Sequence, residues 1–466
     1  MQVNKKQAGV LLHPTSLPNA EGKLGQLNEQ AWLFLDWMAR AKLCVWQTLP
    51  LTHTHEDLSP YQAVSAFAMN PALLPDNWFE QFDQAKFEAY LLSPPHWLDD
   101  YALFVAIRNQ QNLASWVNWP HALKTHDKTA LQAFAETHHS QVTFLKQQQF
   151  ALQTLWQQLK QDANDRGIKL FGDIPIFVAF DSADVWANPE QFKLDENHCP
   201  TVVTGVPPDY FSETGQRWGN PHYNWDKMQA DGFTWWRKRM AASLEQFDMV
   251  RIDHFRGLEA SWEIQATEET AMNGTWEKVP GEALLKALQE DFPDLPIVAE
   301  DLGIITAEVV ALKNQFNLPG MSVLQFGFNG LPDNPHSIYE QVTNSITYTG
   351  THDNDTTLGW FDSLDEGAKN WIIEQLMPIS VDILKQAGLP KSMPWLLIVA
   401  GLKSVANCVI IPMQDWLELG AEHRMNIPGT PEDNWRWQLN ESQIPDNLAD
   451  KIASLIEQTK RCQYSK

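Results

Sequence analysis

Four carboxylates each follow a short apolar segment, at widely separated places in the chain. They are Asp173 after KLFG, Asp253 after MVRI, Glu300 after PIVA and Asp353 after SITYTGTH. A single acid at such a place often caps the next helix or makes a structural ion pair. Four acids that meet at the ends of neighbouring strands, with Arg251 and His352 beside them, indicate a catalytic site.

Two carboxylates in different surroundings suit the cleavage of a glycosidic bond, which needs one ionised and one protonated group. Arg251 lies two residues before Asp253, on the same face of an extended strand, and its positive charge favours the ionised carboxylate. Glu300 follows an apolar segment, and burial there favours its protonated form. Asp353 is then a candidate for binding sugar hydroxyls and favouring a distorted sugar ring, with His352 as a hydrogen-bond donor to the sugar.

Clustered acids also bind metal ions, so a metal site is the alternative use of the same residues. Arg251 argues against it, because a cation already occupies the position beside Asp253 where a metal would need room. We therefore expect no metal and no cofactor. His254 and Arg256, which follow Asp253, are expected to pair with neighbouring acids as structural elements and to take no part in the chemistry.

Eight β-prone segments, several of which end in these polar residues, indicate the scaffold that positions the acids. They span residues 9–18, 44–51, 169–178, 249–257, 296–303, 321–328, 345–354 and 407–417. Helical spacing of apolar residues lies between many of them, at 31–41, 144–159, 282–290 and 368–376. Strands that alternate with helices predict a parallel sheet, and eight such units predict a closed (β/α)8 TIM barrel of the α/β class. Active sites of such barrels lie at the C-terminal ends of the strands, where the four acids stand.

The spacing of these segments is uneven, which predicts insertions within a single catalytic barrel spanning residues 1–466. The long gap after the second segment predicts a largely helical subdomain over residues 52–168. The gap after the third segment predicts an insertion over residues 179–248 that carries an active-site loop. Within it, residues 203–225 are rich in Pro, Gly, Asn and aromatic side chains, a composition typical of loops.

Composition and charge limit the partners and the compartment. The net charge of −24 argues against a nucleic-acid partner. Residues 1–18 hold only a brief apolar run, too short for a signal peptide or a membrane span, so no membrane partner is expected. The four cysteines, at 44, 199, 408 and 462, are far apart, which fits a reducing compartment better than a disulfide framework. We expect a cytoplasmic protein, leave monomer or homodimer open, and regard some of the 21 tryptophans as candidate platforms for sugar rings.

The segments around the acids resemble those of one enzyme family. RIDHFRG at 251–257, VAEDLG at 298–303 and YTGTHDNDTTLGW at 348–360 together resemble the 4-α-glucanotransferases called amylomaltases or disproportionating enzymes, of the α-amylase clan. The likeness extends along nearly the whole chain, to SPYQ at 59–62, FGDIPIFV at 171–178, GVPPDYFSETGQRWGNP at 205–221, RMNIPGT at 424–430 and NWRWQ at 434–438. The resemblance implies transfer of an α-1,4-glucan segment to the 4-hydroxyl of a glucan or glucose acceptor, by a retaining double displacement.

The resemblance also implies roles for individual residues. In such enzymes the Asp of RIDH is the nucleophile, the Glu of AEDLG the acid/base and the Asp of THDN the transition-state stabiliser, which here are Asp253, Glu300 and Asp353. The implied substrate-binding residues are Arg251, His352, Asp173, Tyr61 stacked beneath the sugar, Asp209, Tyr210, Trp218 and Asn426. The loop at 205–221 would overhang the cleft. The family fold is a barrel with inserted subdomains and no C-terminal β-sandwich.

Two other functions stay open at this point. A hydrolase would use the same residues with water as the acceptor, and the products formed from a short maltodextrin distinguish it. A non-catalytic glucan-binding protein is disfavoured, because all three catalytic acids are present. The chain also departs from the family pattern, with LTHTHEDLSPYQ at 51–62 in place of a glycine-rich turn and Asp433 where glycine is usual. These departures bear on acceptor binding and product length.

Overall fold

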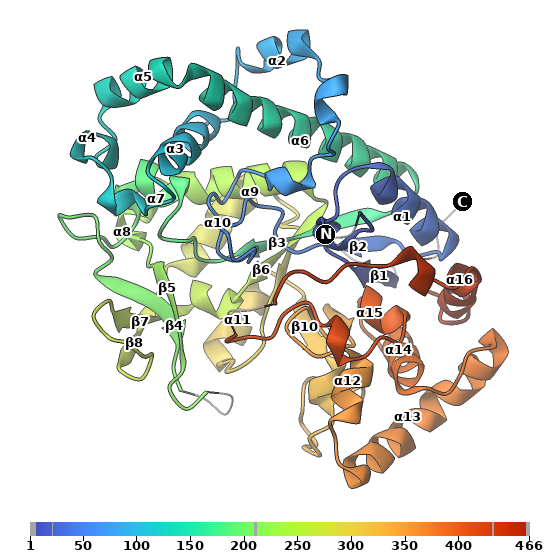
Figure 1. Cartoon of the computed structure of the whole chain (residues 1–466). Helices are drawn as coiled ribbons and strands as arrows, with labels where there is room; N and C mark the ends of the chain where they lie inside the picture. The colour runs from blue at the N-terminus through green and yellow to red at the C-terminus, as the bar shows by residue number, and fades with distance from the viewer. Residues whose placement is uncertain (1–5, 21, 209–211, 431–432, 463–466) are drawn as a thin grey trace.

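A barrel of eight parallel strands lies at the centre of the molecule (Figure 1). The computed structural model describes residues 6–20, 22–208, 212–430 and 433–462. The barrel strands are β1 (Gln7–Leu11), β2 (Val45–Gln47), β3 (Lys169–Pro175), β6 (Met249–Asp253), β9 (Ile297–Ala299), β10 (Gly320–Val323), β11 (Ser345–Tyr348) and β12 (Cys408–Pro412). Their order is β10-β11-β12-β1-β2-β3-β6-β9, and the Ala299 amide donates to the Pro319 carbonyl at 2.8 Å, which nearly closes the barrel. The predicted (β/α)8 barrel and its eight strands are confirmed.

Side chains of each strand alternate between the barrel interior and the surrounding helices, as the pleat of a strand requires. In β6, Met249 belongs to the buried cluster inside the barrel, whereas Val250 and Ile252 belong to the outer cluster between strands and helices. Arg251 and Asp253 follow Met249 with the same two-residue period. The inner face of β6 therefore changes from apolar to charged toward the C-terminal end of the strand, which is the mouth of the barrel.

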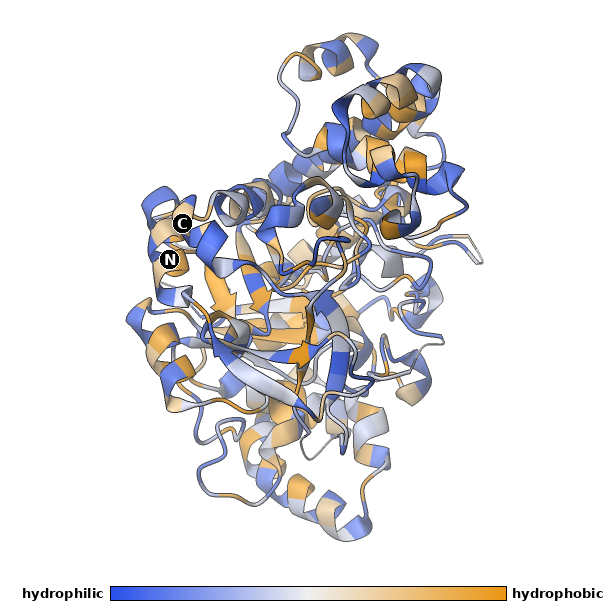
Figure 2. Ribbon diagram, turned by 90° about the vertical axis from the view of Figure 1, so that its left-hand side faces the viewer, coloured by the Kyte–Doolittle hydropathy of each residue, from blue (hydrophilic) through white to orange (hydrophobic). Residues whose placement is uncertain are grey.

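Helices cover the outside of the barrel. They include α1 (Glu29–Arg40), α6 (His139–Asp165), α9 (Thr234–Gln246), α10 (Gly281–Asp291), α11 (Ala307–Gln315), α13 (Glu366–Ala387), α14 (Met393–Lys403) and α16 (Leu448–Gln458). The four predicted helical segments fall on α1, α6, α10 and α13. Figure 2 shows apolar residues concentrated on the central strands, while the outer helices carry both apolar and polar residues.

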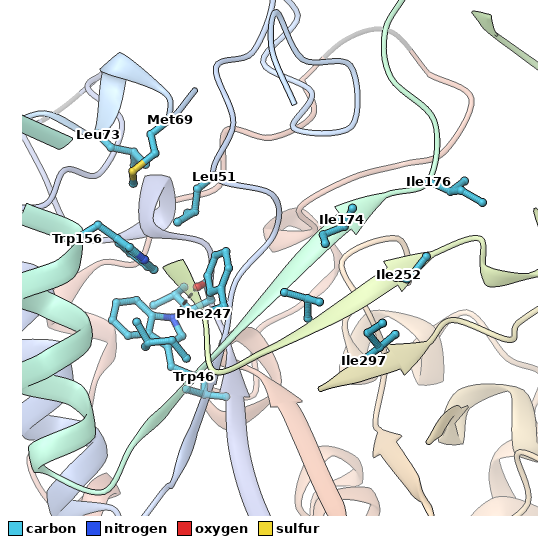
Figure 3. Packing of buried hydrophobic residues seen from close by; sticks show 14 of the residues in the cluster. Trp46, Leu51, Met69, Leu73, Trp156, Ile174, Ile176, Phe247, Ile252 and Ile297 are labelled. Carbon is cyan, nitrogen blue, oxygen red and sulfur yellow. Dashed lines mark hydrogen bonds between the residues drawn. The ribbon is translucent and has the colours of Figure 1, made fainter. Parts of the chain in front are cut away.

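Large aromatic side chains fill the space between the strands and α6. Figure 3 shows Trp46 of β2, Trp156 of α6 and Phe247 packed together in this layer. The ring centroids of Trp156 and Phe247 lie 5.7 Å apart. A Cβ atom on Gly172 of β3 would lie 2.2 Å from the Phe247 ring, so this position requires glycine. The glycine directly before Asp173 thus lets β3 approach its helical cover.

The two long gaps between strands hold additional elements. Between β2 and β3 lie α2 (Gln84–Tyr90), α3 (Leu98–Gln110), α4 (His121–Lys124), α5 (Lys128–Thr137) and α6. Between β3 and β6 lie α7 (Ala183–Ala187), β4 (Val202–Val206), β5 (Gln216–Pro221), α8 (Trp225–Ala230) and α9. The remaining short helices are α12 (Thr357–Asp362) and α15 (Met413–Trp416). In Figure 1, α2 to α6 form a helical layer along the upper side of the barrel.

A second, antiparallel sheet lies beside the barrel in the order β5-β4-β7-β8 (Figure 1). It includes β7 (Ala260–Gln265) and β8 (Gly274–Lys278). The prediction that much of residues 203–225 is loop is wrong for β4 and β5, which occupy two parts of this segment. Pro and Gly within it do indicate turns, but Val202 of β4 pairs with Gln265 of β7, and local composition cannot reveal so distant a partner.

The described residues after β12 form α15, α16 and short 3-10 turns, and they contain no strand. This agrees with the absence of a C-terminal β-sandwich that the family resemblance implies. Within the same described ranges of the chain, no helix is long and apolar enough to cross a membrane.

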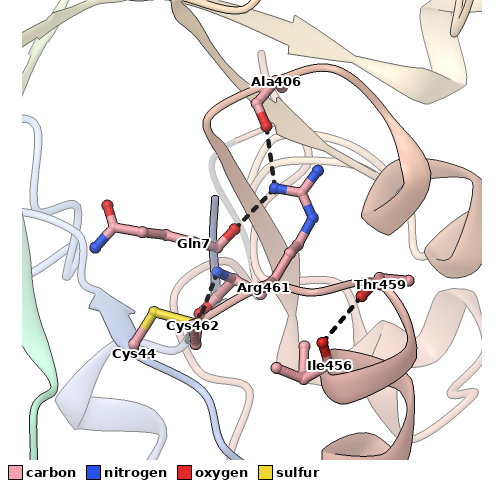
Figure 4. The surroundings of a disulfide bond; sticks show 8 residues. Gln7, Cys44, Ala406, Ile456, Thr459, Arg461 and Cys462 are labelled. Atoms are coloured by element: carbon pink, nitrogen blue, oxygen red, sulfur yellow. Dashed lines mark hydrogen bonds between the residues drawn. A yellow bond between two sulfur atoms is a disulfide. The ribbon is translucent and has the colours of Figure 1, made fainter. Parts of the chain in front are cut away.

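A disulfide between Cys44, directly before β2, and Cys462 ties the C-terminal segment to the N-terminal end of the barrel (Figure 4). Next to it, the buried Arg461 donates to the carbonyls of Gln7 and Ala406, at 3.1 and 3.0 Å. The scattered cysteines, which favour free thiols, therefore give the wrong expectation for this pair. The two cysteines are 418 residues apart, so no spacing pattern in the sequence could indicate that they meet.

Candidate active site

Arg251 holds two of the predicted acids at the mouth of the barrel. Asp173 and Arg251 are register partners on β3 and β6, so their side chains share one layer of the barrel interior. Arg251 Nη1 donates to both carboxylate oxygens of Asp173, at 2.8 and 2.7 Å, and Nη2 donates to Asp253 Oδ1 at 2.6 Å. The Asp173 side chain is 1% exposed and that of Asp253 is 30% exposed. Asp253 is therefore the one of the two that a ligand at the mouth can reach.

Tyr61 fixes Asp173 from a second side. Its hydroxyl donates to Asp173 Oδ2 at 2.7 Å. Burial raises the pKa of Asp173, and the charge of Arg251 opposes this shift. Burial and the Asp173 charge raise the pKa of Tyr61 well above its ordinary value, so the hydroxyl keeps its proton. The Tyr61 ring stacks on the His352 ring, with 5.1 Å between centroids and 13° between planes.

Glu300 follows β9, and its carboxylate accepts two backbone hydrogen bonds. The His254 amide donates to Oε2 at 2.7 Å, and the Leu302 amide donates to Oε1 at 2.8 Å. His254 has a left-handed backbone, with φ of 54°, which directs its amide toward Glu300. Burial raises the pKa of Glu300 to about 7, although Arg251 opposes the shift. This is the direction that the apolar segment before Glu300 predicts, and it allows proton exchange near neutral pH.

Asp353 lies in the loop after β11, and its side chain is 48% exposed. Asn426 Nδ2 donates to its Oδ1 at 2.6 Å, and Arg424 Nη2 donates to its backbone carbonyl at 2.9 Å. His352 Nε2 lies 3.4 Å from the same Oδ1. The C-terminal segment therefore orients this acid at the barrel mouth.

The four-stranded sheet reaches the site through Trp218 of β5. The Trp218 ring is half-buried and stands edge-on to the His254 ring, with 4.9 Å between centroids and 88° between planes. Its indole N–H donates to the Gln216 side chain at 3.2 Å. The predicted site residues Asp209 and Tyr210 lie outside the described residues.

The site combines one carboxylate beside a permanent cation with another whose burial favours the proton. Environments that differ in this way divide two carboxylates into an ionised group and a proton donor. Such a division suits a reaction in which one group attacks a carbon atom while the other protonates the leaving oxygen. Among the residues that the structure describes, no group of three or more His, Cys, Asp and Glu side chains could hold a metal ion.

Comparison with known proteins agrees with this chemistry. A family model described as 4-alpha-glucanotransferase matches residues 12–79 and 76–443. The chain belongs to the 4-alpha-glucanotransferase family. The resemblance seen in the motifs is confirmed, and with it an enzyme that acts on α-1,4-glucans.

Relatives match this chain over nearly its whole length. The 4-alpha-glucanotransferase of Thermus thermophilus is 41% identical over 497 residues, which cover 97% of this chain and 98% of the relative. The chloroplastic/amyloplastic 4-alpha-glucanotransferase of Solanum tuberosum is 38% identical, and the match covers 97% of this chain and 86% of the relative. An amylomaltase from Streptococcus agalactiae, solved in complex with acarbose, has a TM-score of 0.91 at 31% identity, with 98% and 100% covered. An amylomaltase from Corynebacterium glutamicum shares the fold, with a TM-score of 0.74 at 18% identity. The match covers 98% of this chain and 75% of that protein.

Two side chains at the site lie outside the predicted set. Trp435 places its ring 5.8 Å from Tyr61 and 5.9 Å from His352, between centroids. Arg424 contacts the backbone of Asp353. Both belong to segments that resemble the family, RMNIPGT and NWRWQ, but a motif does not show which of its residues turn toward the acids.

The expectation that His254 and Arg256 pair with neighbouring acids is wrong. In the described part of the chain neither side chain lies at ion-pair distance from an acid, although the His254 backbone amide donates to Glu300 and the charges of Glu259 and Glu308 act on Arg256 from farther away. Burial lowers the pKa of His254 to about 4, so its ring is neutral at pH 7. Arg256 donates to the Ile304 carbonyl at 2.7 Å instead. The strand ends at Asp253 and the chain turns into a 3-10 helix, η6 (Phe255–Leu258), so a strand pattern does not place these side chains.

Proposed function

We propose that Asp253 attacks the anomeric carbon of an α-1,4-linked glucosyl unit while Glu300 protonates the leaving oxygen. The bond between C1 and the leaving O4 breaks as a bond between C1 and an Asp253 carboxylate oxygen forms. The proton of Glu300 ends on the released O4, which becomes a 4-hydroxyl group. The remaining glucosyl segment stays on Asp253 as a β-linked ester.

In the second step, the 4-hydroxyl of an acceptor attacks C1 and Glu300 takes its proton. Asp253 leaves as a carboxylate, and the second inversion restores the α-1,4 bond. The donor is a maltodextrin, starch or glycogen-type glucan, and the acceptor is glucose or a maltooligosaccharide. Retention by this route requires carboxyl groups about 5–5.5 Å apart, which stays a prediction for Asp253 and Glu300.

The opposite environments of the two carboxylates are the observation that carries this proposal. Asp253 accepts a hydrogen bond from Arg251 at 2.6 Å and remains 30% exposed, as a reachable ionised nucleophile should be. Glu300 is 7% exposed, and burial raises its pKa to about 7. A group with this pKa can donate a proton in the first step and accept one in the second near neutral pH.

The remaining predicted residues would hold the sugar. We assign substrate binding to Arg251, His352, Asp173, Tyr61, Asp209, Tyr210, Trp218 and Asn426. Asp353 would stabilise the transition state, and its hydrogen bond from Asn426 at 2.6 Å supports a fixed orientation. Because both oxygens of Asp173 are already bound by Arg251, its main contribution would be to orient Arg251.

Transfer requires that a bound acceptor reach the intermediate before water does. Residues 205–221, which include β5 and Trp218, are the proposed shield over the intermediate. We also propose that residues 1–466 work as one catalytic unit, with 52–168 and 179–248 as insertions. The cytoplasmic location stays a prediction from the sequence.

Incubation with maltotriose tests transfer directly. We expect a ladder of longer maltodextrins together with glucose, and no increase in reducing ends. Glucose and maltose with rising reducing ends would instead show hydrolysis at the same site. No change in maltotriose would contradict the proposal as a whole.

Substitution of the nucleophile tests the assignment of Asp253. Asp253→Asn should abolish turnover of maltotriose and leave the circular dichroism spectrum unchanged, because the amide retains the shape of the side chain. Full activity in this variant would rule out Asp253 as the nucleophile.

A further inference from the structure

The loop after Glu300 carries one of the two amides that hold its carboxylate. Leu302 donates to Glu300 Oε1 at 2.8 Å, and the loop then continues through Gly303 to α11. Gly303 has φ of 80°, a conformation that glycine adopts without strain. The Ile304 side chain is 55% exposed, so it does not anchor the loop. On one side of Leu302 the loop is anchored by the Asp301 carboxylate, which accepts from the Met321 amide at 2.7 Å. On the other side, the Ile304 backbone carbonyl is the point where a further contact can hold the loop.

Arg256 makes such a contact. Its Nη1 donates to the Ile304 carbonyl at 2.7 Å. Arg256 is only 8% exposed, and its guanidinium carbon lies 3.8 Å from the ring centroid of Trp276 in β8. A cation over an aromatic face at this distance is a favourable contact. Trp276 therefore holds the guanidinium in place, and the guanidinium holds the loop.

Each amide donor to Glu300 is thus connected to a tryptophan of the four-stranded sheet. The ring of Trp218 in β5 contacts the ring of His254, whose amide is the first donor. Trp276 in β8 supports Arg256, which binds the loop of the second donor. Since β5 and β8 are the two edge strands of this sheet, the sheet supports Glu300 from both of its edges.

We propose that Arg256, supported by Trp276, is a positioning residue for Glu300. The inference rests on the proposed acid/base role of Glu300, which must stay within hydrogen-bond reach of the leaving oxygen. Without Arg256 the Ile304 carbonyl loses its donor, and the loop with the Leu302 amide can shift. A displacement of about 1 Å can cost roughly 10²-fold in rate. Arg256 itself transfers no proton.

Two donors with different leaving groups test this role. Cleavage of maltotriose needs a proton on the leaving sugar oxygen, whereas fluoride leaves α-maltosyl fluoride without a proton from Glu300. The kcat/KM for each donor reports the first bond-breaking step. We expect Arg256→Met to lower kcat/KM for maltotriose by about 10- to 100-fold, and kcat/KM for fluoride release by less than about threefold.

Further variants serve as controls. Arg256→Lys keeps the charge and one donor group and should recover part of the maltotriose rate. Arg237→Met removes an arginine that pairs with Glu290 and Asp291 at the surface, and it should change neither rate. If Arg256→Met does not fold by circular dichroism, Trp276→Leu removes the supporting ring from a partly exposed position, and the same selective loss is expected.

Equal losses on the two donors, or no loss on maltotriose, would overturn the positioning role of Arg256. Glu300→Gln, measured alongside, should lose cleavage of maltotriose and keep most of its kcat/KM for fluoride release. If Glu300→Gln loses both equally, the proposed acid role of Glu300 fails. If Glu300→Gln is selective and Arg256→Met is not, the acid role stands and only the role of Arg256 fails.

Discussion

Arg251 and Asp173 form an ion pair inside the barrel, in which one guanidinium nitrogen donates to both carboxylate oxygens, at 2.8 and 2.7 Å. Their side chains are 6% and 1% exposed. A buried pair of this kind contributes little net stability, because its attraction is offset by the removal of both charges from water. Its effect here is geometric, since it leaves the second guanidinium nitrogen directed at Asp253.

Removal of one member of this ion pair should lower the free energy of unfolding. Asp173→Asn leaves the Arg251 charge poorly compensated, and we expect the free energy of unfolding to fall by about 3 kcal/mol. Activity on maltotriose should fall as well, because Arg251 is then free to turn from Asp253. Urea unfolding followed by tryptophan fluorescence measures the first effect. Asp76→Asn, which breaks an exposed pair with Lys23, is the control and should leave stability nearly unchanged. Equal stability of the Asp173→Asn variant and the unmodified enzyme would contradict this view of the pair.

The pH dependence of activity should follow Glu300. Burial raises the pKa of Glu300 to about 7, and the first step needs its protonated form. We therefore expect kcat/KM for maltotriose to fall as pH rises above about 7, roughly tenfold per unit. For α-maltosyl fluoride this alkaline decline should be absent. A kcat/KM for maltotriose that stays level up to pH 9 would show that Glu300 is not the acid.

The free energy of unfolding should also depend on the protonation of Glu300. The pKa of Glu300 rises from 4.5 to about 7 because burial disfavours its charge, so the folded protein binds the proton more tightly than the unfolded chain. Its contribution is fully present below about pH 4.5 and is lost as pH rises through about 7, a change of about 3 kcal/mol. Glu300→Gln cannot lose a proton, so its stability relative to the unmodified enzyme should rise between pH 5 and 8. Urea unfolding at pH 5 and pH 8 measures the free energy of unfolding of both proteins. An equal change in the two proteins between these pH values would contradict a buried, protonated Glu300.

Asn426 should matter for catalysis through Asp353. Its side chain donates to Asp353 Oδ1 at 2.6 Å, and the Asp353 side chain is otherwise 48% exposed. Without this donor the carboxylate can turn toward water, and Asn426→Ala should lower kcat/KM for maltotriose by about 10- to 100-fold. Asn440→Ala, which removes a cap of a 3-10 turn in the same C-terminal segment, should not. Similar rates for Asn426→Ala and the unmodified enzyme would show that catalysis does not depend on the hydrogen bond from Asn426 to Asp353.

The disulfide between Cys44 and Cys462 should contribute to stability and leave activity unchanged. It closes a loop of 418 residues, so reduction should lower the free energy of unfolding, by up to about 5 kcal/mol. The bond lies at the N-terminal end of the barrel, opposite the acids, so maltotriose turnover at 25 °C should not change. Unfolding in urea with and without dithiothreitol measures the effect, and Cys462→Ser should be insensitive to the reductant. Cys199→Ser, at an exposed unpaired cysteine, is the control. Identical curves with and without dithiothreitol would contradict the expectation.

Patterns that depend on neighbours in the sequence could be predicted. The two-residue period from Met249 through Arg251 to Asp253 predicts three side chains on one face of a strand, and the structure shows them inside the barrel. The apolar segment before Glu300 predicts its burial and raised pKa. The eight strands follow from the same kind of local signal.

Features that depend on partners far along the chain could not be predicted. The sequence does not predict β4 as a strand, because β4 forms a strand only by pairing with β7, which lies far along the chain. Trp435 reaches Tyr61 only because the chain returns to the barrel mouth after β12. Asp433 shows an intermediate case. The family resemblance implies a glycine at this position. Asp433 has φ of 61°, in the left-handed region that glycine adopts without strain, so the structure shows why glycine suits this position.

Trapping of the covalent intermediate tests the central claim most directly. Glu300→Gln incubated with α-maltosyl fluoride should form the glycosyl ester, because fluoride leaves without a proton, and should break it down slowly, because no base activates the acceptor. Digestion and mass spectrometry should then find a maltosyl adduct on the peptide that contains residues 249–257, with the modification on Asp253. An adduct on a different acid, or fluoride release with no adduct and an inverted product, would contradict the account.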